Sequence, residues 1–325
     1  MKLVILSEET DRSSDIVCSW LYRNHIPYLR LNSEKFVNPK IEIKETPTET
    51  SVILSKNGFK VDLSQTEIVW FRRGHLYAYS PYYGKEISSV VMAELNEHIE
   101  NESSTLRHYV YQILANKKKI NYPDEYNYNK LIALHEAAKV GLKIPYTIVS
   151  NDGKTIRKFV NDSRGCITKC IQDISSISVG TEKTSIGKIA EVEYDDITEE
   201  SYWYSLFQKE IPKKYELRVF FFLGKMYSMA IFSQLDGKSR LDFRDVDVNG
   251  VRPNRMVPFN LPKDIKKKIY QLMKRLNLES GSLDLIVTPT DEYYFLEVNP
   301  VGQFNFVSGI CNYYIEKNIA KYLAK

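Results

Sequence analysis

The chain has 325 residues, of which 43% are hydrophobic and 26% charged, a composition typical of a globular protein with two or three packed units. Its formal net charge of +4 is small, so no overall field indicates a nucleic-acid or membrane partner. No stretch approaches transmembrane length, and MKLVILSEETDRSSD lacks the long apolar core of a signal peptide. These features together predict a cytoplasmic protein.

The first 120 residues predict an α/β domain. Residues 2–9 and 27–32 have the pattern of strands that flank a helix over 13–26, and strands are expected at 51–55 and 67–73. A long helix is expected between about 85 and 119, with a single apolar stripe formed by Ile87, Val91, Leu95 and Ile99. The lysine run 117–119 and the segment NYPDEYN then indicate a domain boundary.

The rest of the chain predicts an α+β arrangement. The expected elements are an Asn129-capped helix, a strand after Pro145, the strand CITKC, a mobile polar loop over 172–188, a strand at 201–211, a hairpin at 215–234, a helix at 264–278 and a final hairpin ending at Pro300. There is no internal repeat.

Several common sites are excluded by their spacing. There is no G-x-x-x-x-G-K-[ST] loop and no G-x-G-x-x-G after the first strand. The five histidines are not clustered, which argues against a histidine-based metal site. The four cysteines, Cys18, Cys166, Cys170 and Cys311, lack zinc or disulfide spacing and are expected to be reduced and buried.

The segment YFLEVNPVGQF carries polar groups at the end of an apolar strand. Strand alternation places Glu297 and Asn299 on one face with Phe295. A hairpin loop of four residues, Pro289 to Glu292, would set Asp284 opposite Glu297 on that face. Facing carboxylates repel each other, and a hard cation such as magnesium would relieve the repulsion. The alternative is a solvated edge, and a loop one residue longer would turn Asp284 away.

Two lysines and one polar strand each allow two interpretations, a binding role or a purely structural one. Lys169 shares a strand face with Ile167 and Ile171, so it either extends its stem to solvent or meets an anion. Lys130 begins a helix, where a cation is disfavoured unless an anion binds nearby. The stretch FQKEIPKKYELRVF mixes donors and acceptors that could grip a purine, a ribose and phosphates, or could simply form a charged edge strand.

Taken in order, these pieces resemble the ATP-grasp superfamily, over about residues 120 to 325. The resemblance implies a central subdomain over 121–205 and a C-terminal subdomain over 206–325, with ATP held between them. It implies phosphate contacts from Lys130, Lys169 and Arg218, adenine and ribose contacts from Gln208, Lys209, Glu210, Ile211 and Glu216, and two magnesium ions held by Asp284, Glu297 and Asn299. The phosphate loop of many members is glycine-rich, whereas QDISSISVGTEKTSIGK has few glycines.

Three stretches, IVWFRRG, LDFRD and RPNRMVPFNLP, resemble more specifically the graspetide ligases of microviridin-like pathways. The resemblance implies ATP-dependent joining of Asp or Glu side chains to Ser, Thr or Lys side chains within a ribosomal precursor peptide. It implies substrate contacts from Arg72, Asp242 and Arg244, leader docking on the central subdomain, and a possible homodimer.

The chemistry implied by the resemblance begins with transfer of the γ-phosphoryl group to a carboxylate, which turns a poor electrophile into a mixed anhydride. Arg218 or Arg244 would stabilise the oxyanion formed during attack by the second side chain. The alternatives are a ligase that adds amino acids to a protein tail or a small acid, and a non-catalytic ATP-binding scaffold.

Overall fold

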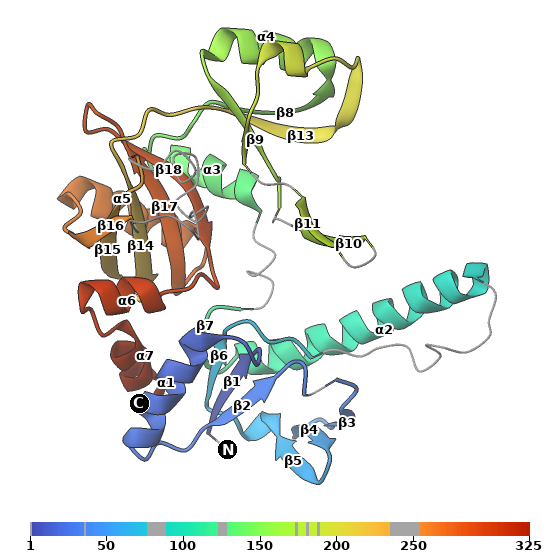
Figure 1. Ribbon diagram of the computed structural model, residues 1–325. Coiled ribbons are helices and arrows are strands. Elements are labelled where there is room, and N and C mark those ends of the chain that lie inside the picture. Colours follow the sequence, from blue (N-terminus) through green and yellow to red (C-terminus); the bar gives the residue numbers. More distant parts are fainter. Residues whose placement is uncertain are drawn as a thin grey trace. The chain divides into compact units, whose positions relative to one another are not determined.

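The structure is a computed structural model that describes residues 2–35, 37–76, 89–122, 129–172, 175–179, 182–186, 189–234 and 254–325. It divides into two compact units, the first formed by Met1–Asn127, Gln303–Ser308 and Tyr314–Lys325, the second by Tyr128–Gly302 and Gly309–Tyr313. Both chain ends therefore belong to the first unit (Figure 1). The further divisions at residues 120 and 205 stay predictions.

The first unit contains a parallel sheet in the order β2-β1-β6-β7. Its strands are β1 (Leu3–Ser7), β2 (Leu29–Asn32), β6 (Ile68–Phe71) and β7 (Lys118–Ile120). Helix α1 (Arg12–Arg23) joins β1 to β2, as the sequence predicts, and α7 (Ile315–Leu323) packs on α1. The lysine run is not a break in the structure, because Lys118 and Lys119 pair with β6.

A second, antiparallel sheet in this unit is formed by β3 (Lys40–Glu45), β4 (Thr50–Lys56) and β5 (Phe59–Asp62), followed by a 3₁₀ turn at Leu63–Gln65. Helix α2 (Ser89–Ala115) buries Val110, Tyr111 and Leu114 in the core that these sheets share. The predicted stripe is only partly correct, because Val91 is exposed, and its first residue, Ile87, lies outside the described residues. The C-terminal half of α2 therefore supplies the anchoring residues.

The second unit contains a four-stranded sheet in the order β12-β9-β13-β8. Its elements are β8 (Thr147–Asp152), α4 (Gly153–Ser163), β9 (Cys166–Lys169), β12 (Ala190–Glu191), a 3₁₀ turn at Tyr194–Asp196 and β13 (Ser201–Lys209). Helix α4 covers one face, where Ile156 and Phe159 pack against Cys166 and Phe207 (Figure 1). The opposite face carries the residues that alternate with these.

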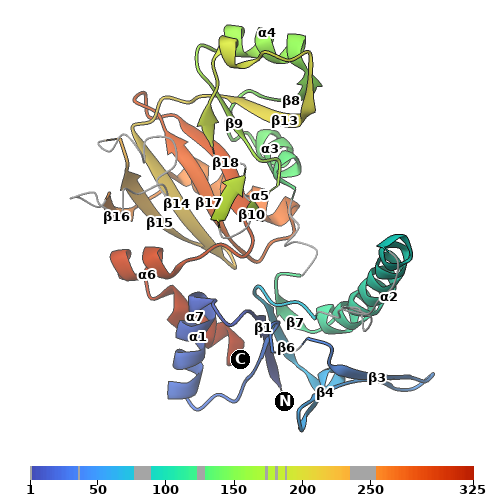
Figure 2. The same ribbon diagram turned by 45° about the vertical axis from the view of Figure 1, so that its right-hand side comes forward.

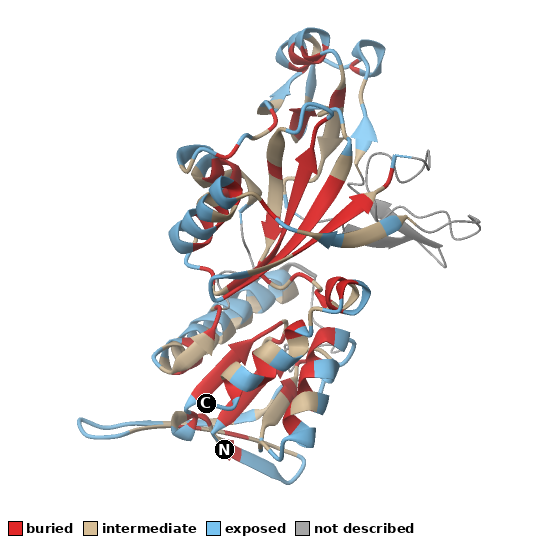
Figure 3. Ribbon diagram, turned by 90° about the vertical axis from the view of Figure 1, so that its left-hand side faces the viewer, coloured by how far each residue is buried: buried red, intermediate tan, exposed pale blue. Residues whose placement is uncertain are grey.

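The same unit contains a five-stranded antiparallel sheet in the order β16-β15-β14-β17-β18. Its elements are α3 (Lys130–Lys139), β14 (Tyr215–Phe222), β15 (Lys225–Phe232), β16 (Arg255–Phe259), α5 (Lys263–Arg275), β17 (Ser280–Val287) and β18 (Tyr293–Asn299). Helices α3 and α5 cover one face (Figures 1 and 2), and the central strands are the most buried part of the unit (Figure 3). Helix α6 (Asn305–Cys311) follows β18.

The segment predicted as a loop over 172–188 contains two strands. β10 (Ser175–Val179) and β11 (Glu182–Ile186) form an antiparallel pair. The alternation of serine with isoleucine and valine is compatible with a strand, so the serine-rich composition was a misleading guide. None of the helices in the described part of the chain is both long enough and apolar enough to span a bilayer.

All four cysteines are free thiols, as expected, but only three are buried, since Cys170 is partly exposed. Burial raises the pKa of Cys18 and of Cys166 to about 11, so at about pH 8 only about one such thiol in a thousand is ionised. We expect iodoacetamide to label Cys170 first, as followed by peptide mass spectrometry. All four should react alike in denaturant, and equally fast labelling of Cys18 or Cys166 in the folded protein would contradict the prediction.

Candidate active site

The face of the five-stranded sheet opposite α3 and α5 gathers the predicted metal and phosphate residues. Leu217, Val219, Leu283 and Leu285 face the helices as part of the core. Residues alternate along a strand, so Glu216, Arg218 and Asp284 point to the opposite face. Arg218 on β14 is paired directly with Asp284 on β17. Three predicted residues from two neighbouring strands therefore meet on one surface.

The predicted pairing of Asp284 with Glu297 is confirmed, but the path to it differs. Val287 pairs with Tyr293, so the hairpin loop is one residue longer than expected. A register shift between Asp284 and Leu285 then inserts an extra residue into β18 and restores the pairing of Asp284 with Glu297. The predicted face of Phe295 is wrong for the same reason, because Phe295 and Val298 both lie in the core.

The facing carboxylates are neutralised by basic side chains of the chain itself. The Nη1 atom of Arg218 donates to both Asp284 oxygens, at 2.6 and 2.7 Å, and both side chains are about nine-tenths buried. The Nζ atom of Lys130 lies 3.5 Å from a Glu297 oxygen. This answers the question of how the carboxylates tolerate each other, since each has a cation beside it.

The donor set suits magnesium. Asp284 and Glu297 supply carboxylate oxygens and Asn299 an amide oxygen, which already accepts a hydrogen bond from the Val301 amide at 3.0 Å. Hard oxygen donors of this kind are typical of magnesium sites. Within the described residues there is no cluster of three or more His, Cys, Asp or Glu that could hold a metal. Assignment of these three residues to magnesium stays a prediction.

Glu216 contacts Lys213, a basic residue that the sequence analysis did not assign to the site. Its carboxylate accepts from the Nζ atom of Lys213 at 2.8 Å and from the Ser233 hydroxyl at 2.9 Å. Burial raises the pKa of Glu216, and the Lys213 charge only partly opposes that rise. The spacing of Lys213 and Glu216 in PKKYE was the available signal, and the buried Lys213 adds a third positive group at this face.

The second wall of the predicted nucleotide site is the face of the four-stranded sheet opposite α4. Lys169 pairs with Leu206, and Ile167 pairs with Gln208, so these side chains lie opposite the face packed on α4. Gln208 is buried and donates to the Thr147 hydroxyl at 2.9 Å. Lys169 is partly buried on this mainly apolar surface, an environment suited to holding an anionic group.

The segment that joins β13 to β14 begins with two backbone hydrogen bonds. The amide of Lys209 donates to Tyr146 and the amide of Glu210 to Gly165, at 2.9 and 3.0 Å. Both bonds fix the path of the chain as it leaves β13. Across the described residues the Ile211 amide has no such backbone partner, so the linker has a donor suited to an adenine edge. The predicted adenine contacts remain a prediction.

Of the three predicted substrate residues, only Arg72 lies in the described part of the chain. Asp242 and Arg244 lie outside the described residues. Arg72 is buried in the first unit, where its Nε and Nη2 atoms lie 3.1 and 3.4 Å from the Asp11 carboxylate. Its predicted contact with substrate stays a prediction.

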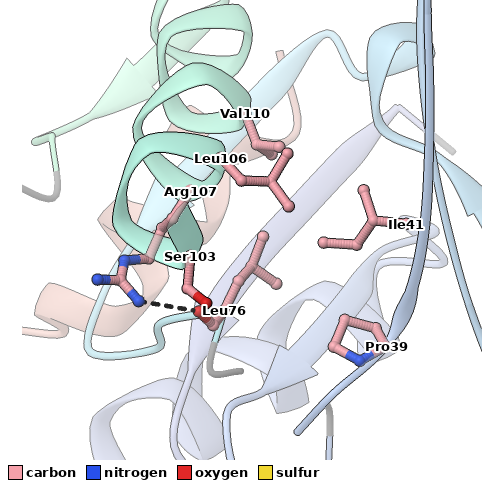
Figure 4. A pocket seen from close by; sticks show the side chains of 7 residues that line it. All are labelled: Pro39, Ile41, Leu76, Ser103, Leu106, Arg107 and Val110. Carbon is pink, nitrogen blue, oxygen red and sulfur yellow. Dashed lines mark hydrogen bonds between the residues drawn. The ribbon is translucent and has the colours of Figure 1, made fainter. Parts of the chain in front are cut away.

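A separate cavity of about 170 Å³ lies in the first unit (Figure 4), lined by Pro39, Ile41, Leu76, Ser103, Leu106, Arg107 and Val110. Arg107 donates to the Leu76 carbonyl at 3.4 Å. The lining holds no carboxylate, so it offers none of the ligands that a nucleotide-bound metal needs.

Comparison with solved structures identifies the architecture. A RiPP-associated ATP-grasp ligase from Chryseobacterium gregarium, solved with ADP and a leader and core peptide, matches with a TM-score of 0.82 and 25% identity, covering 100% of this chain and 96% of that one. The macrocyclase MdnC from Microcystis aeruginosa, bound to its precursor peptide MdnA, matches with a TM-score of 0.79 and 24% identity, covering 99% of each chain. No protein-family model matches the sequence, and no curated protein matches it.

The chain therefore has the α+β ATP-grasp fold over its whole length. The predicted resemblance to graspetide ligases is confirmed by these neighbours, which include a second macrocyclase, MdnB, at a TM-score of 0.75.

Proposed function

We propose that the protein is an ATP-dependent, ADP-forming ligase that cyclises a ribosomal precursor peptide by joining its Asp or Glu side chains to Ser, Thr or Lys side chains. The observation that carries the proposal is the end-to-end match to ligases solved with leader, core or precursor peptides. The charged face of the five-stranded sheet supports it, because it gathers carboxylates and cations of the kind that phosphoryl transfer requires.

When bound, magnesium would neutralise the charge of the transferred phosphoryl group, and two ions held by Asp284, Glu297 and Asn299 fit that task. Lys169 would face the phosphates from the other sheet. Arg218 lies beside Asp284, where its guanidinium could bind a phosphoryl oxygen. The Ile211 amide would donate to adenine. We propose this division of roles for the residues of this chain.

The leader of the precursor would dock on the central subdomain. Trp203 and Tyr204 are 82% and 57% exposed there, with their rings 5.5 Å apart. They lie where the pairing of β13 with β8 is interrupted, between Ser201 and Ser205. The nearby stretch 190–200 contains six acidic residues. An exposed aromatic pair beside negative charge is suited to a peptide with apolar and basic side chains.

Replacing Trp203 by alanine is expected to weaken binding of a fluorescent leader peptide by about tenfold or more, because aromatic anchors dominate peptide interfaces. The melting temperature should not change, since the side chain is exposed. Tyr22→Ala, which removes a 76% exposed ring in the other unit, is the matched control. Unchanged leader affinity in Trp203→Ala would reject this docking surface.

Intact-mass measurement tests the function itself. The protein, ATP and magnesium would be incubated with a candidate precursor rich in Ser, Thr, Asp and Glu, and each ring formed should remove one water, about 18 Da. A mass gain would instead indicate addition of a free amino acid, and the absence of any ATP-dependent mass change would contradict the proposal.

We also propose that the protein is a homodimer and acts in the cytoplasm. Light scattering would measure its oligomeric state.

A further inference from the structure

Lys213 and Glu216 form an ion pair at the start of β14, in the second unit. The Nζ atom of Lys213 lies 2.8 Å from the Oε1 atom of Glu216, and the two side chains are 7% and 8% exposed. Lysine is seldom buried to this extent unless it is paired, and breaking a buried pair leaves the remaining charge without compensation. The Lys213 side chain therefore acts inside the protein, on the sheet face that carries Glu216.

Lys214, the next residue, has the opposite surroundings. Its side chain is 46% exposed and pairs with Asp291 at 2.7 Å, while its backbone amide donates to the Val287 carbonyl at 2.8 Å. Surface pairs of this kind contribute little to stability. The two consecutive lysines thus differ in burial and in partner, which makes Lys214 a matched control for Lys213.

The Glu216 carboxylate is held at one of its two oxygens. The hydroxyl of Ser233, a fully buried residue directly after β15, donates at 2.9 Å to the same Oε1 atom that Lys213 contacts. Across the described residues, no donor contacts the other oxygen, Oε2. An ionised carboxylate can accept about four hydrogen bonds, so Glu216 keeps the capacity to accept from a ligand on the face that also carries Arg218 and Asp284.

The charge state of Glu216 depends on Lys213. Burial favours the neutral form and raises the pKa of Glu216, and the charge of Asp284 on the neighbouring strand acts in the same direction. The Lys213 charge and the hydrogen bonds from Lys213 and Ser233 lower the pKa, although burial prevails. Without Lys213 the pKa would rise further. Because a protonated carboxyl group becomes a donor, Lys213 helps to keep Glu216 an acceptor.

An ionised carboxylate that is fixed at one oxygen suits the vicinal hydroxyls of a ribose. Hydroxyl groups donate to a carboxylate, and hydrogen bonds to a charged acceptor are stronger than those between neutral groups. Phosphate groups, by contrast, are repelled by the charge of Glu216. A site built to bind a hydroxyl rejects an analogue that lacks it, because the buried polar group is then left unpaired. Glu216 is therefore suited to distinguish ribose from deoxyribose.

We propose that Lys213 is a positioning residue: together with Ser233 it holds the Glu216 carboxylate for the ribose hydroxyls of the nucleotide, and through Glu216 it sets a preference for ribonucleotides over deoxyribonucleotides. The inference rests on the proposed function, because Glu216 meets a ribose only if the protein binds ATP. It adds the sugar specificity of that site and the two residues on which this specificity depends.

Calorimetric titration of the full chain with ADP, 2′-deoxy-ADP and 3′-deoxy-ADP, each with magnesium, tests the proposal without turnover. The wild type should bind ADP about tenfold or more tightly than at least one deoxy analogue, as expected for a hydrogen bond to a charged group. Lys213→Met should abolish most of this preference, and Lys213→Arg, which keeps the charge, should retain part of it. Ser233→Ala should reduce the preference less than Lys213→Met does. The control Lys214→Met should leave it unchanged.

A double-variant cycle shows whether Lys213 acts through Glu216. Glu216→Gln should itself reduce the sugar preference, and adding Lys213→Met should then cause no further loss, because residues of one network are not additive. Thermal unfolding is measured for every variant, since a merely structural role would lower the melting temperature and weaken all three nucleotides alike. If Lys213→Met does not fold, Ser233→Ala decides, because it leaves the ion pair in place.

The proposal is overturned if the wild type binds ADP and both deoxy analogues equally well, or if Lys213→Met or Ser233→Ala keeps the wild-type preference. It is also overturned if Lys213→Met lowers the preference further when Glu216 is already replaced by glutamine. Failure of the proposed function would appear differently: either no nucleotide would bind, or nucleotide would bind with the sugar preference while no precursor lost mass.

Discussion

Glu297→Gln is expected to reduce ADP formation by about a hundredfold or more, since even the outer partners of metal ligands are worth about 10- to 100-fold. The substitution preserves the shape of the side chain and removes the negative charge opposite Lys130. Binding of Mn²⁺ in the presence of ADP, measured by electron paramagnetic resonance, should weaken in parallel. The loss therefore has a readout that does not depend on turnover.

A matched control lies on the same hairpin. Glu292 is partly exposed and pairs with Lys143, so Glu292→Gln removes an equivalent charge away from the sheet face that carries Asp284. It should retain wild-type activity and Mn²⁺ affinity. If Glu297→Gln formed ADP at the wild-type rate, the assignment of Glu297 to magnesium would be refuted.

Arg218→Met is expected to cost roughly 3–5 kcal/mol in the free energy of unfolding, because it leaves the Asp284 carboxylate buried without its cation. It should also abolish turnover, since the guanidinium is assigned to the phosphoryl group. Urea unfolding followed by circular dichroism would measure the first effect, and ADP release the second.

The double variant Arg218→Met/Asp284→Leu separates stability from catalysis. Replacing both members of a buried ion pair by apolar residues is often neutral or stabilising, so most of the lost stability should return while the enzyme stays inactive. A double variant as unstable as Arg218→Met would show that the ion pair is not the source of the loss. Recovered activity in the double variant would remove Arg218 and Asp284 from the mechanism.

Much of the fold could be predicted because its signals are local. The Asn129 cap, the apolar strands β14 and β17, and the turn at Leu223–Gly224 each lie within a short stretch, and each forms as expected. The strands β3 and β5 and the helices α4 and α7 were not predicted. They carry their apolar residues among many charged ones, so their stability depends on packing against distant segments.

The pairing of Asp284 with Glu297 was predicted correctly, but from a regular hairpin that the structure does not have. Asp284 and Glu297 do meet, yet a regular hairpin with the observed loop would have turned them apart, and the extra residue in β18 corrects this. Alternation is readable from sequence, whereas a bulge is a cooperative result of core packing at Phe295 and Val298. The contacts of Lys130 and Arg218 were equally hidden, because they join residues more than sixty positions apart.

The cations beside Asp284 and Glu297 have a consequence for the stability of the protein without ligands. Because Arg218 and Lys130 are part of the chain, each carboxylate has a cation beside it before any ligand arrives. We therefore expect the folded chain to have the same melting temperature with and without added magnesium.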